Sequence, residues 1–202
     1  DSNLSYSAPY TGSPIEPAVT VVVDGDVLTE GYTVSYSNHT NVGTATVIVQ
    51  STTGGNYKFF AIATFEITKA KAAFEAGKEP TAKTLVYTGK DQPLVNAGVP
   101  EGGIAYYSLD GTSYSALIPT GVEVGSYTVY AKVQGDSRHE DSDVIPIPVT
   151  IDTNTVANPT VTLSATTFNY TGFEQKPTIT VIDPDHGNEI PATEYTVTYR
   201  GN

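Results

Sequence analysis

The 202-residue sequence contains no cysteine, methionine or tryptophan, and its 10 lysine and arginine residues are outnumbered by 22 aspartate and glutamate residues. Without cysteine, the chain cannot form disulfides, thiolate nucleophiles or Cys-ligated metal sites. The net charge of −12 is spread along the chain. This charge repels polyphosphate and anionic lipid, so neither nucleic acid nor a membrane surface is an expected partner. No apolar run approaches the roughly 18 residues of a membrane-spanning helix, and no signal-peptide pattern is present.

Long-range repetition is the main positive feature of the sequence. Tyr-Thr-Gly begins at Tyr10, Tyr87 and Tyr170, and YTVSY at 32–36 is matched by YTVTY at 195–199. Self-similarity at a long fixed period is typical of tandem arrays. We therefore predict module 1 at 1–69, module 2 at 70–152 and a partial module 3 at 153–202.

The third module is expected to be incomplete. Its sequence follows that of the first module closely but stops at Asn202, where the first module continues through 41–43 into two further strand-like runs. Half a sandwich would expose unpaired strand edges and apolar faces. We therefore expect the natural chain to continue past Asn202.

Alternation of two faces dominates the local pattern and predicts strands. One face of the run 127–134 is formed by every second residue, namely Tyr127, Val129, Ala131 and Val133. The same period of two occurs in 32–36, 45–49 and 61–67, and it is typical of half-buried strands. Turns rich in Gly, Asp and Asn separate these runs. The sequence thus predicts an all-β chain of antiparallel sandwiches or barrels.

Two segments carry more local predictions. The Ala-, Lys- and Glu-rich stretch 69–79 could form a helix, but Gly77 and Pro80 would limit it to under three turns, so we expect an extended strand there. Pro146 and Pro148 stand in the same register of an apolar run. Because prolines remove backbone donors from one side of a strand, this run is predicted to be an edge strand.

These motifs together resemble those of a known family. In the first module they are Tyr-Thr-Gly at 10–12, Pro-x-Val-Thr-Val at 17–21, YTVSYSN at 32–38, NVGTATV at 41–47, Gly-Asn-Tyr at 55–57 and Phe-x-Ile-Thr at 65–68. This pattern resembles the Gly-rich, mostly-β (MBG-type) immunoglobulin-like repeats of bacterial cell-surface proteins. The likeness is close over 6–69, and the middle module is similar to a related subtype that lacks the usual aromatic at 138–140.

The resemblance implies tandem immunoglobulin-like antiparallel β-sandwich modules in an extracellular, cell-surface or secreted protein. It carries no catalytic residues and no cofactor. We accordingly expect a non-catalytic stalk, part of a large adhesin-like protein, whose partners are the neighbouring domains of a longer chain and possible cell-wall or host glycans and proteins. Two alternatives stay open: a carbohydrate- or host-ligand-binding module of an adhesin, and a self-assembling repeat whose broken module is completed by a strand from another chain.

Candidate sites are few. Among the least repeated tyrosines (Tyr106, Tyr107, Tyr114 and Tyr130), Tyr130 is on the outward phase of its strand, which makes it the candidate for stacking on a sugar. The acidic cluster Asp136, Glu140, Asp141 and Asp143 offers oxygen ligands suited to Ca²⁺, although its spacing is that of no EF-hand. Lys58 and Lys132 are candidate donors for an isopeptide crosslink. The three histidines, His39, His139 and His186, are expected to be exposed in separate loops.

Overall fold

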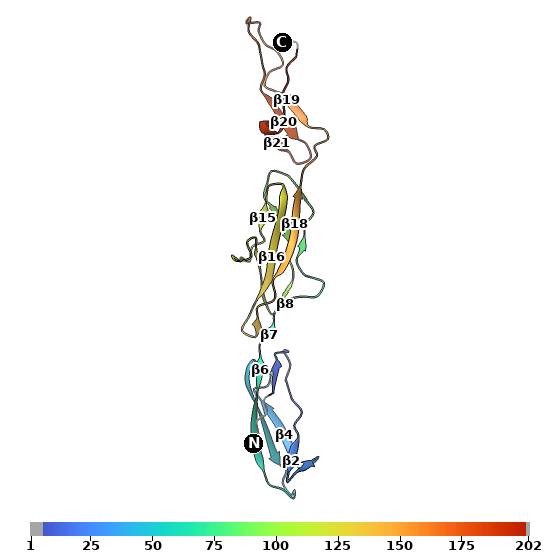
Figure 1. Cartoon of the computed structure of the whole chain (residues 1–202), viewed down its shortest axis with the longest axis vertical. Helices are drawn as coiled ribbons and strands as arrows, with labels where there is room; N and C mark the ends of the chain where they lie inside the picture. The colour runs from blue at the N-terminus through green and yellow to red at the C-terminus, as the bar shows by residue number, and fades with distance from the viewer. Residues whose placement is uncertain (1–5, 201–202) are drawn as a thin grey trace.

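The computed structural model describes residues 6–200. Within that range all regular structure is β-strand except for one turn of 3-10 helix, η1 (Ala192–Glu194), so the prediction of an all-β chain is confirmed. No helix in the described part is long and apolar enough to cross a membrane. The strands form three groups that follow one another along a single long axis (Figure 1). We call them the N-terminal unit (β1–β6), the middle unit (β7–β18) and the C-terminal unit (β19–β21 and η1).

The N-terminal unit is built on a four-stranded sheet with the order β1-β6-β5-β4, beside a β2–β3 hairpin. Its strands are β1 (Ser7–Pro9), β2 (Val21–Val23), β3 (Asp26–Leu28), β4 (Tyr32–Ser37), β5 (Gly43–Ser51) and β6 (Phe60–Thr68). The hairpin turn places Asp24 and Gly25 at positive φ (54° and 92°). A two-residue turn with both residues at positive φ matches the twist of the strands that it joins, which explains the Asp-Gly sequence.

The core of this unit lies on the predicted face of its long strands. Ala45, Val47 and Val49 of β5 are buried, and so are Phe65 and Ile67 of β6, as the period of two predicts. Partly buried Tyr10, Ile15 and Tyr36 pack against Ala45, Phe65 and Ile67. The prediction for β6 holds only in its second half, because Ala61 at its start is exposed.

The middle unit contains a second four-stranded sheet, with the order β10-β18-β16-β14, and four two-stranded ladders. Its strands are β7 (Ala70–Lys71), β8 (Ala73–Phe74), β9 (Thr81–Ala82), β10 (Leu85–Val86), β11 (Gln92–Pro93), β12 (Val95–Asn96), β13 (Pro100–Glu101), β14 (Gly103–Ser108), β15 (Thr120–Gly121), β16 (Gly125–Gly135), β17 (His139–Glu140) and β18 (Ile145–Asp152). The stretch 69–79 is extended, as predicted, since it supplies β7 and β8 in place of a helix.

One core cluster joins the large sheet of the middle unit to the short ladders. Val129, Ala131, Val133, Ile147, Val149 and Ile151 come from the sheet, and Ala72, Phe74, Leu94 and Val95 come from the opposing segments. The ladders therefore cover the apolar face of the sheet as a second layer, an arrangement consistent with a β-sandwich.

The two large sheets share topology and register. In each, the first strand runs parallel to the last: β1 pairs with β6 and β10 pairs with β18. The tyrosine of each Tyr-Thr-Gly turn then donates its backbone N–H to the last strand, from Tyr10 to Thr68 and from Tyr87 to Asp152. Gly43 and Gly125 stand opposite equivalent isoleucines of β6 and β18. The large sheets of the two units therefore have the same strand pairing.

The strand that carries Pro146 and Pro148 is an edge over most of its length. β18 pairs with β16 from Ile145 to Ile151, and its recorded pairing on the other side is with β10 at Ile151 and Asp152. The edge prediction is therefore confirmed for the part that contains the prolines and is wrong for the last two residues, where the short β10 covers the edge.

The C-terminal unit is a three-stranded sheet of β19 (Thr160–Leu163), β20 (Ile179–Asp183) and β21 (Asn188–Ile190). Its buried side chains are Val181 and Asp183, and all four residues of β19 are exposed. The tyrosines of the three Tyr-Thr-Gly turns differ in burial: Tyr10 and Tyr87 are half-buried, whereas Tyr170 is 96% exposed. The described part of the C-terminal unit has no counterpart of the β5–β6 core that would cover Tyr170.

Candidate functional site

Three members of the acidic cluster proposed for calcium each contact a different basic side chain. Asp136 lies 2.7 Å from His139 Nδ1, Asp141 lies 2.9 Å from Lys132 Nζ, and Asp143 lies 2.6 Å from Lys71 Nζ. The fourth member, Glu140, is exposed and contributes backbone to β17. No group of three metal-binding side chains occurs among residues 6–200. The geometry therefore favours a set of surface ion pairs, each of which contributes little by itself.

The other residues singled out in the sequence also lack a binding-site geometry. Tyr130 is half-buried, and its ring lies 3.6 Å from the position that a Cβ on Gly111 would occupy, so the turn at 110–111 covers part of one ring face. Lys132 Nζ stands 5.0 Å from the centre of the Tyr114 ring and donates to Asp141. Lys58 lies in an exposed position of the β5–β6 loop.

The three histidines lie in separate segments, as predicted, and His39 and His186 are in a loop and a turn, but His139 belongs to β17 and all three are partly buried, contrary to the prediction that they are exposed. Their side chains are 22%, 18% and 29% accessible for His39, His139 and His186, and each has a carboxylate within ion-pair distance. Two of them belong to Asp-x-x-His segments, Asp136 to His139 and Asp183 to His186. These two segments lie where one unit meets the next. The junctions between units therefore contain hydrogen-bonded Asp–His pairs.

The first junction is built around Tyr10 of the N-terminal unit. Its ring meets the ring of His139 edge-on, with the centroids 5.5 Å apart and an interplanar angle of 87°. The guanidinium of Arg138 lies 5.5 Å from the centre of the same Tyr10 ring, within the range of cation–π attraction. The Tyr-Thr-Gly turn of one unit is thus held by the β16–β17 loop of the next.

Backbone contacts fix this junction from the middle unit's side. β7 begins two residues after β6 ends and pairs in parallel with β17, which carries His139. Asp136 Oδ1 accepts from the backbone N–H of Arg138 and contacts His139 Nδ1 at 2.7 Å, so the loop has a defined shape. The hydrogen bond with His139 is the main reason why the pKa of Asp136 is lowered from its ordinary value.

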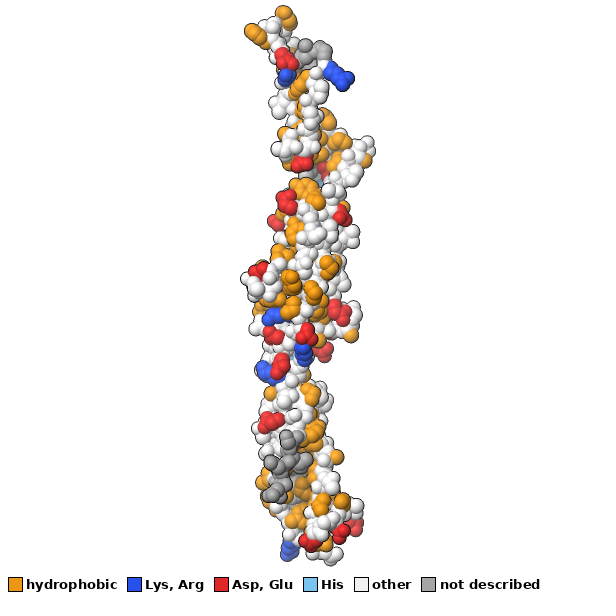
Figure 2. All heavy atoms as spheres, in the orientation of Figure 1, with side chains coloured by type: hydrophobic (Ala, Val, Ile, Leu, Met, Phe, Trp, Pro, Cys, Tyr) orange, Lys and Arg blue, Asp and Glu red, His pale blue; other side chains and the backbone are white. Residues whose placement is uncertain are grey.

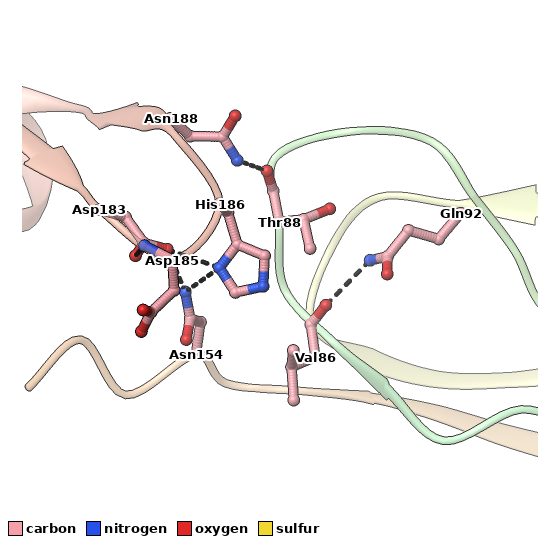
Figure 3. Close-up of polar contacts among 8 residues, drawn as sticks. All are labelled: Val86, Thr88, Gln92, Asn154, Asp183, Asp185, His186 and Asn188. Carbon is pink, nitrogen blue, oxygen red and sulfur yellow. Dashed lines mark hydrogen bonds and ion pairs between the residues drawn. The ribbon is translucent and has the colours of Figure 1, made fainter.

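The second junction uses another Tyr-Thr-Gly turn, that of the middle unit. Asn188 of the C-terminal unit donates its side-chain N–H to the carbonyl of Thr88, as Figure 3 shows. Below this contact, Asp183 Oδ2 accepts a 2.6 Å hydrogen bond from Asn154 and lies 2.7 Å from His186 Nδ1. The first residues after β18 are thereby tied to the β20–β21 turn.

Asp183 is buried, and its hydrogen bonds favour its charged form. Its pKa is lowered first by the hydrogen bond with His186, and also by the backbone N–H of Asp185 and by Asn154, while desolvation acts in the opposite direction. A carboxylate that accepts several hydrogen bonds in the folded state binds its proton more weakly there than in the unfolded chain. The junction is therefore coupled to pH.

We expect acid to weaken this junction. Because the folded-state pKa of Asp183 lies below its unfolded value of about 3.9, its contribution is complete above pH 5 and is lost as pH falls through the folded-state pKa. Asp183→Asn should lower the melting temperature of the C-terminal unit at pH 6.5, and the difference from wild type should shrink toward pH 2. Thermal unfolding followed by circular dichroism at a series of pH values measures both. A difference that is constant with pH would contradict the assignment.

Sequence reasoning did not find the junctions, although a signal was present. An acidic residue three positions before a histidine occurs both at 136–139 and at 183–186, in turn-rich segments of two different modules. Side chains three residues apart in a turn can meet, so the repeated spacing could have suggested two Asp–His pairs. What the sequence did not indicate is that each pair lies beside the Tyr-Thr-Gly turn of the preceding unit.

Comparison with models of known protein families gives no match for this chain, and no curated protein matches it either.

Proposed function

We propose that the chain is a non-catalytic, force-transmitting spacer made of tandem immunoglobulin-like β-sandwich modules, in a large bacterial cell-surface or secreted protein. One observation carries the proposal: in both large sheets, the first strand lies beside the last strand and runs parallel to it. This arrangement suits a chain that is pulled from its two ends.

The mechanical argument follows from the direction of the strands. In the N-terminal unit the chain enters through β1 and leaves through β6, and the pairing places Ser7 opposite Glu66 and Pro9 opposite Thr68. Tension pulls the start of β1 and the end of β6 in opposite directions. The hydrogen bonds between them are then loaded together in shear, whereas the bonds of a hairpin pulled at its open end break one after another.

The connections between the units support the same role. A single residue, Lys69, separates β6 from β7, and the middle unit repeats the parallel arrangement in its β7–β17 and β10–β18 pairs. The units lie end to end in Figure 1, and polar and aromatic contacts connect each to the next. Short, contacted joints restrict bending more than a flexible Gly/Ser linker would.

One further hydrogen bond, which occurs in both the first and the third predicted module, supports the proposal that these modules are repeats. Tyr36 donates its hydroxyl to the carbonyl of Pro17, and Tyr199 does the same to Pro177 at 2.7 Å. These are the closing tyrosines of YTVSY and YTVTY and the prolines that follow the first and third Tyr-Thr-Gly turns. The immunoglobulin-like assignment, the bacterial origin and the extracellular location rest on the motif resemblance.

Removing one hydrogen-bond donor from the β1–β6 pair is the direct test. Tyr6 accepts from Glu66 and Tyr10 donates to Thr68, so the alternation of the strand directs the N–H of Ala8 toward β6 and that of Ser7 away from it. Ala8→Pro should cost about 1 kcal/mol of stability and lower the force at which the N-terminal unit unfolds. Ser7→Pro is the matched control and should leave that force nearly unchanged.

Single-molecule pulling through the two ends of the chain measures this force. Because the sequence has no cysteine, cysteine handles added outside the strands are unique attachment points. Equal unfolding forces for wild type and Ala8→Pro would mean that the parallel pair does not carry the tension, and the spacer proposal would lose its main support.

A further inference from the structure

Strand β4 forms one edge of the large sheet in the N-terminal unit, and no strand among residues 6–200 pairs with its outer side. The carbonyl of Gly31, just before β4, accepts a hydrogen bond from the N–H of Thr52, so alternate backbone groups from Gly31 onward point toward β5. The groups that point away belong to Tyr32, Val34 and Tyr36. In the described part of the chain, none of these backbone groups has a hydrogen-bond partner.

The openness of this edge does not depend on where the chain begins or ends. The chain enters the N-terminal unit through β1 and leaves it through β6, and the order β1-β6-β5-β4 places both strands on the other side of β5. β3 precedes β4 and β5 follows it within the same unit. A domain attached at either end of the unit would therefore join it away from the free side of β4.

The middle unit closes the equivalent edge with its own chain. β14 holds the place of β4 in the order β10-β18-β16-β14. Its Tyr107 exchanges two backbone hydrogen bonds with Ser115, at 2.7 and 2.9 Å. Ser115 belongs to the segment 109–124, which leads from β14 to β16, whereas only residues 38–42 lead from β4 to β5. This short connection cannot fold back along the edge as the longer one does.

β4 also lacks the features that keep exposed strand edges apart. Its sequence YTVSYS contains no proline and no charged residue, and its register with β5 has no bulge. By contrast, β18 carries Pro146 and Pro148 where its edge is open. On the face drawn in Figure 2, charged side chains are few along the N-terminal unit and gather at its outer end. An unprotected edge of this kind is a template for strand addition.

The sequence of β4 indicates which strand fits this edge, because YTVSY reads nearly the same in both directions about Val34. An antiparallel copy centred on Val34 places Tyr32 opposite Tyr36 and Thr33 opposite Ser35. In this register the outward-pointing residues all fall in hydrogen-bonded pairs, and the members of each pair exchange two backbone bonds. Aromatic pairs and Thr–Ser pairs on neighbouring strands are favourable contacts.

We propose that β4 is the contact site for a second copy of this chain, joined edge to edge by antiparallel pairing of the two β4 strands about Val34. The contact is isologous and uses the free edge of both copies, so it closes at the dimer. Because the strands of this sheet follow the long axis of the molecule (Figure 1), the two copies point in opposite directions and overlap along their N-terminal units. This contact goes beyond the role of a spacer and does not depend on it.

Sedimentation velocity of the whole chain over a wide range of concentration tests the proposal. Wild type should pass from monomer to a plateau at the dimer. Val34→Pro should weaken association at least about tenfold, because it removes both central N–H···O bonds of the dimer without removing a bond to β5. Val34→Ala is the matched control: it shortens the same side chain but keeps the N–H, so it should still dimerise. Circular dichroism verifies that both variants are folded.

Cysteine crosslinking tests the register and does not rely on the proline variant. The exposed Thr33 and Ser35 would face each other in a non-hydrogen-bonded pair, with Cα atoms about 4.5 Å apart, a distance that a disulfide can bridge. A mixture of Thr33→Cys and Ser35→Cys chains should therefore form disulfide-linked dimers under a mild oxidant. Each variant alone should form few, because identical residues are diagonal neighbours about 7–8 Å apart. The sequence has no other cysteine to compete.

Several outcomes would overturn the proposed β4 contact. A wild type that stays monomeric at every concentration is one of them, and growth past the dimer without a plateau is another, since it requires a contact that does not close. The proposal also fails if Val34→Pro associates as strongly as Val34→Ala. Equal crosslinking in the mixture and in each cysteine variant alone would show that the strands do not pair about Val34.

Discussion

Replacing Leu94 by alanine is expected to destabilise the middle unit by about 2–5 kcal/mol, the range for deleting a large buried aliphatic side chain. Leu94 is fully buried and comes from the layer that faces the large sheet. Its Cδ2 approaches Ile151 Cδ1 and the Tyr127 ring around Gly121, since all three lie 3.0–3.1 Å from the position of a Cβ on that glycine. Such close packing leaves little room for the surroundings to collapse into the cavity.

The measurement must report the stability of each unit separately. Amide hydrogen exchange should become faster in β16 and β18 of the Leu94→Ala chain, while β5 and β6 of the N-terminal unit keep their wild-type rates. Leu117→Ala serves as the control for the same chemical change, because its side chain is exposed and surface substitutions usually stay within about 0.5 kcal/mol. If the two variants had the same stability, the short ladders would not form a true second layer.

The long strands could be predicted from the sequence because their pattern and their structure are both local. The alternation of Ala45, Val47 and Val49 specifies one face, and burial of that face follows once a partner strand lies on each side. The same is true of Val129 and Val133 in β16. By contrast, the short ladders span only two residues each, which is less than the length at which a period of two can be recognised.

The junctions could not be predicted for a different reason. The half-buried state of His139 depends on Tyr10, which is more than a hundred positions away, and His186 contacts Asn154, which is 32 positions away. A histidine in a polar, turn-rich segment has the same local sequence whether it faces solvent or another unit. The exposure of Tyr170 is also non-local, because the motif around it matches that around Tyr10 while the core that covers Tyr10 comes from β5 and β6.

The glycine pair next to the first junction is a further non-local feature. Gly103 and Gly135 stand opposite each other at the end of the β14–β16 ladder. A Cβ on Gly135 would clash with the carbonyl oxygen of His139 and lie 2.6 Å from the carbonyl carbon of Glu140; a Cβ on Gly103 would clash with the carbonyl of Gln134. All of these are backbone atoms, which cannot move aside as the end of a flexible side chain can. Glycine is therefore required here by close approach of chains.

Gly135→Ala should accordingly destabilise the middle unit by about 1–3 kcal/mol, the cost of forcing extra atoms into a packed site. It should also loosen the first junction, because the displaced residues His139 and Glu140 form β17, which pairs with β7 and carries the ring that meets Tyr10. Chemical denaturation measures the first effect. NMR relaxation measures the second, as faster and more independent tumbling of the N-terminal unit.

Gly55→Ala is the matched control for this prediction. Gly55 lies in the corresponding loop of the N-terminal unit, its φ is not in the positive range, and the nearest atom to an added Cβ is 3.6 Å away, an ordinary van der Waals distance. The same methyl group should therefore be tolerated at Gly55 and rejected at Gly135. A Gly135→Ala chain with lower stability but unchanged tumbling would show that β17 stabilises the middle unit without orienting its neighbour. Lower stability together with faster tumbling of the N-terminal unit would show that the segment 135–140 both packs in the middle unit and orients the N-terminal unit.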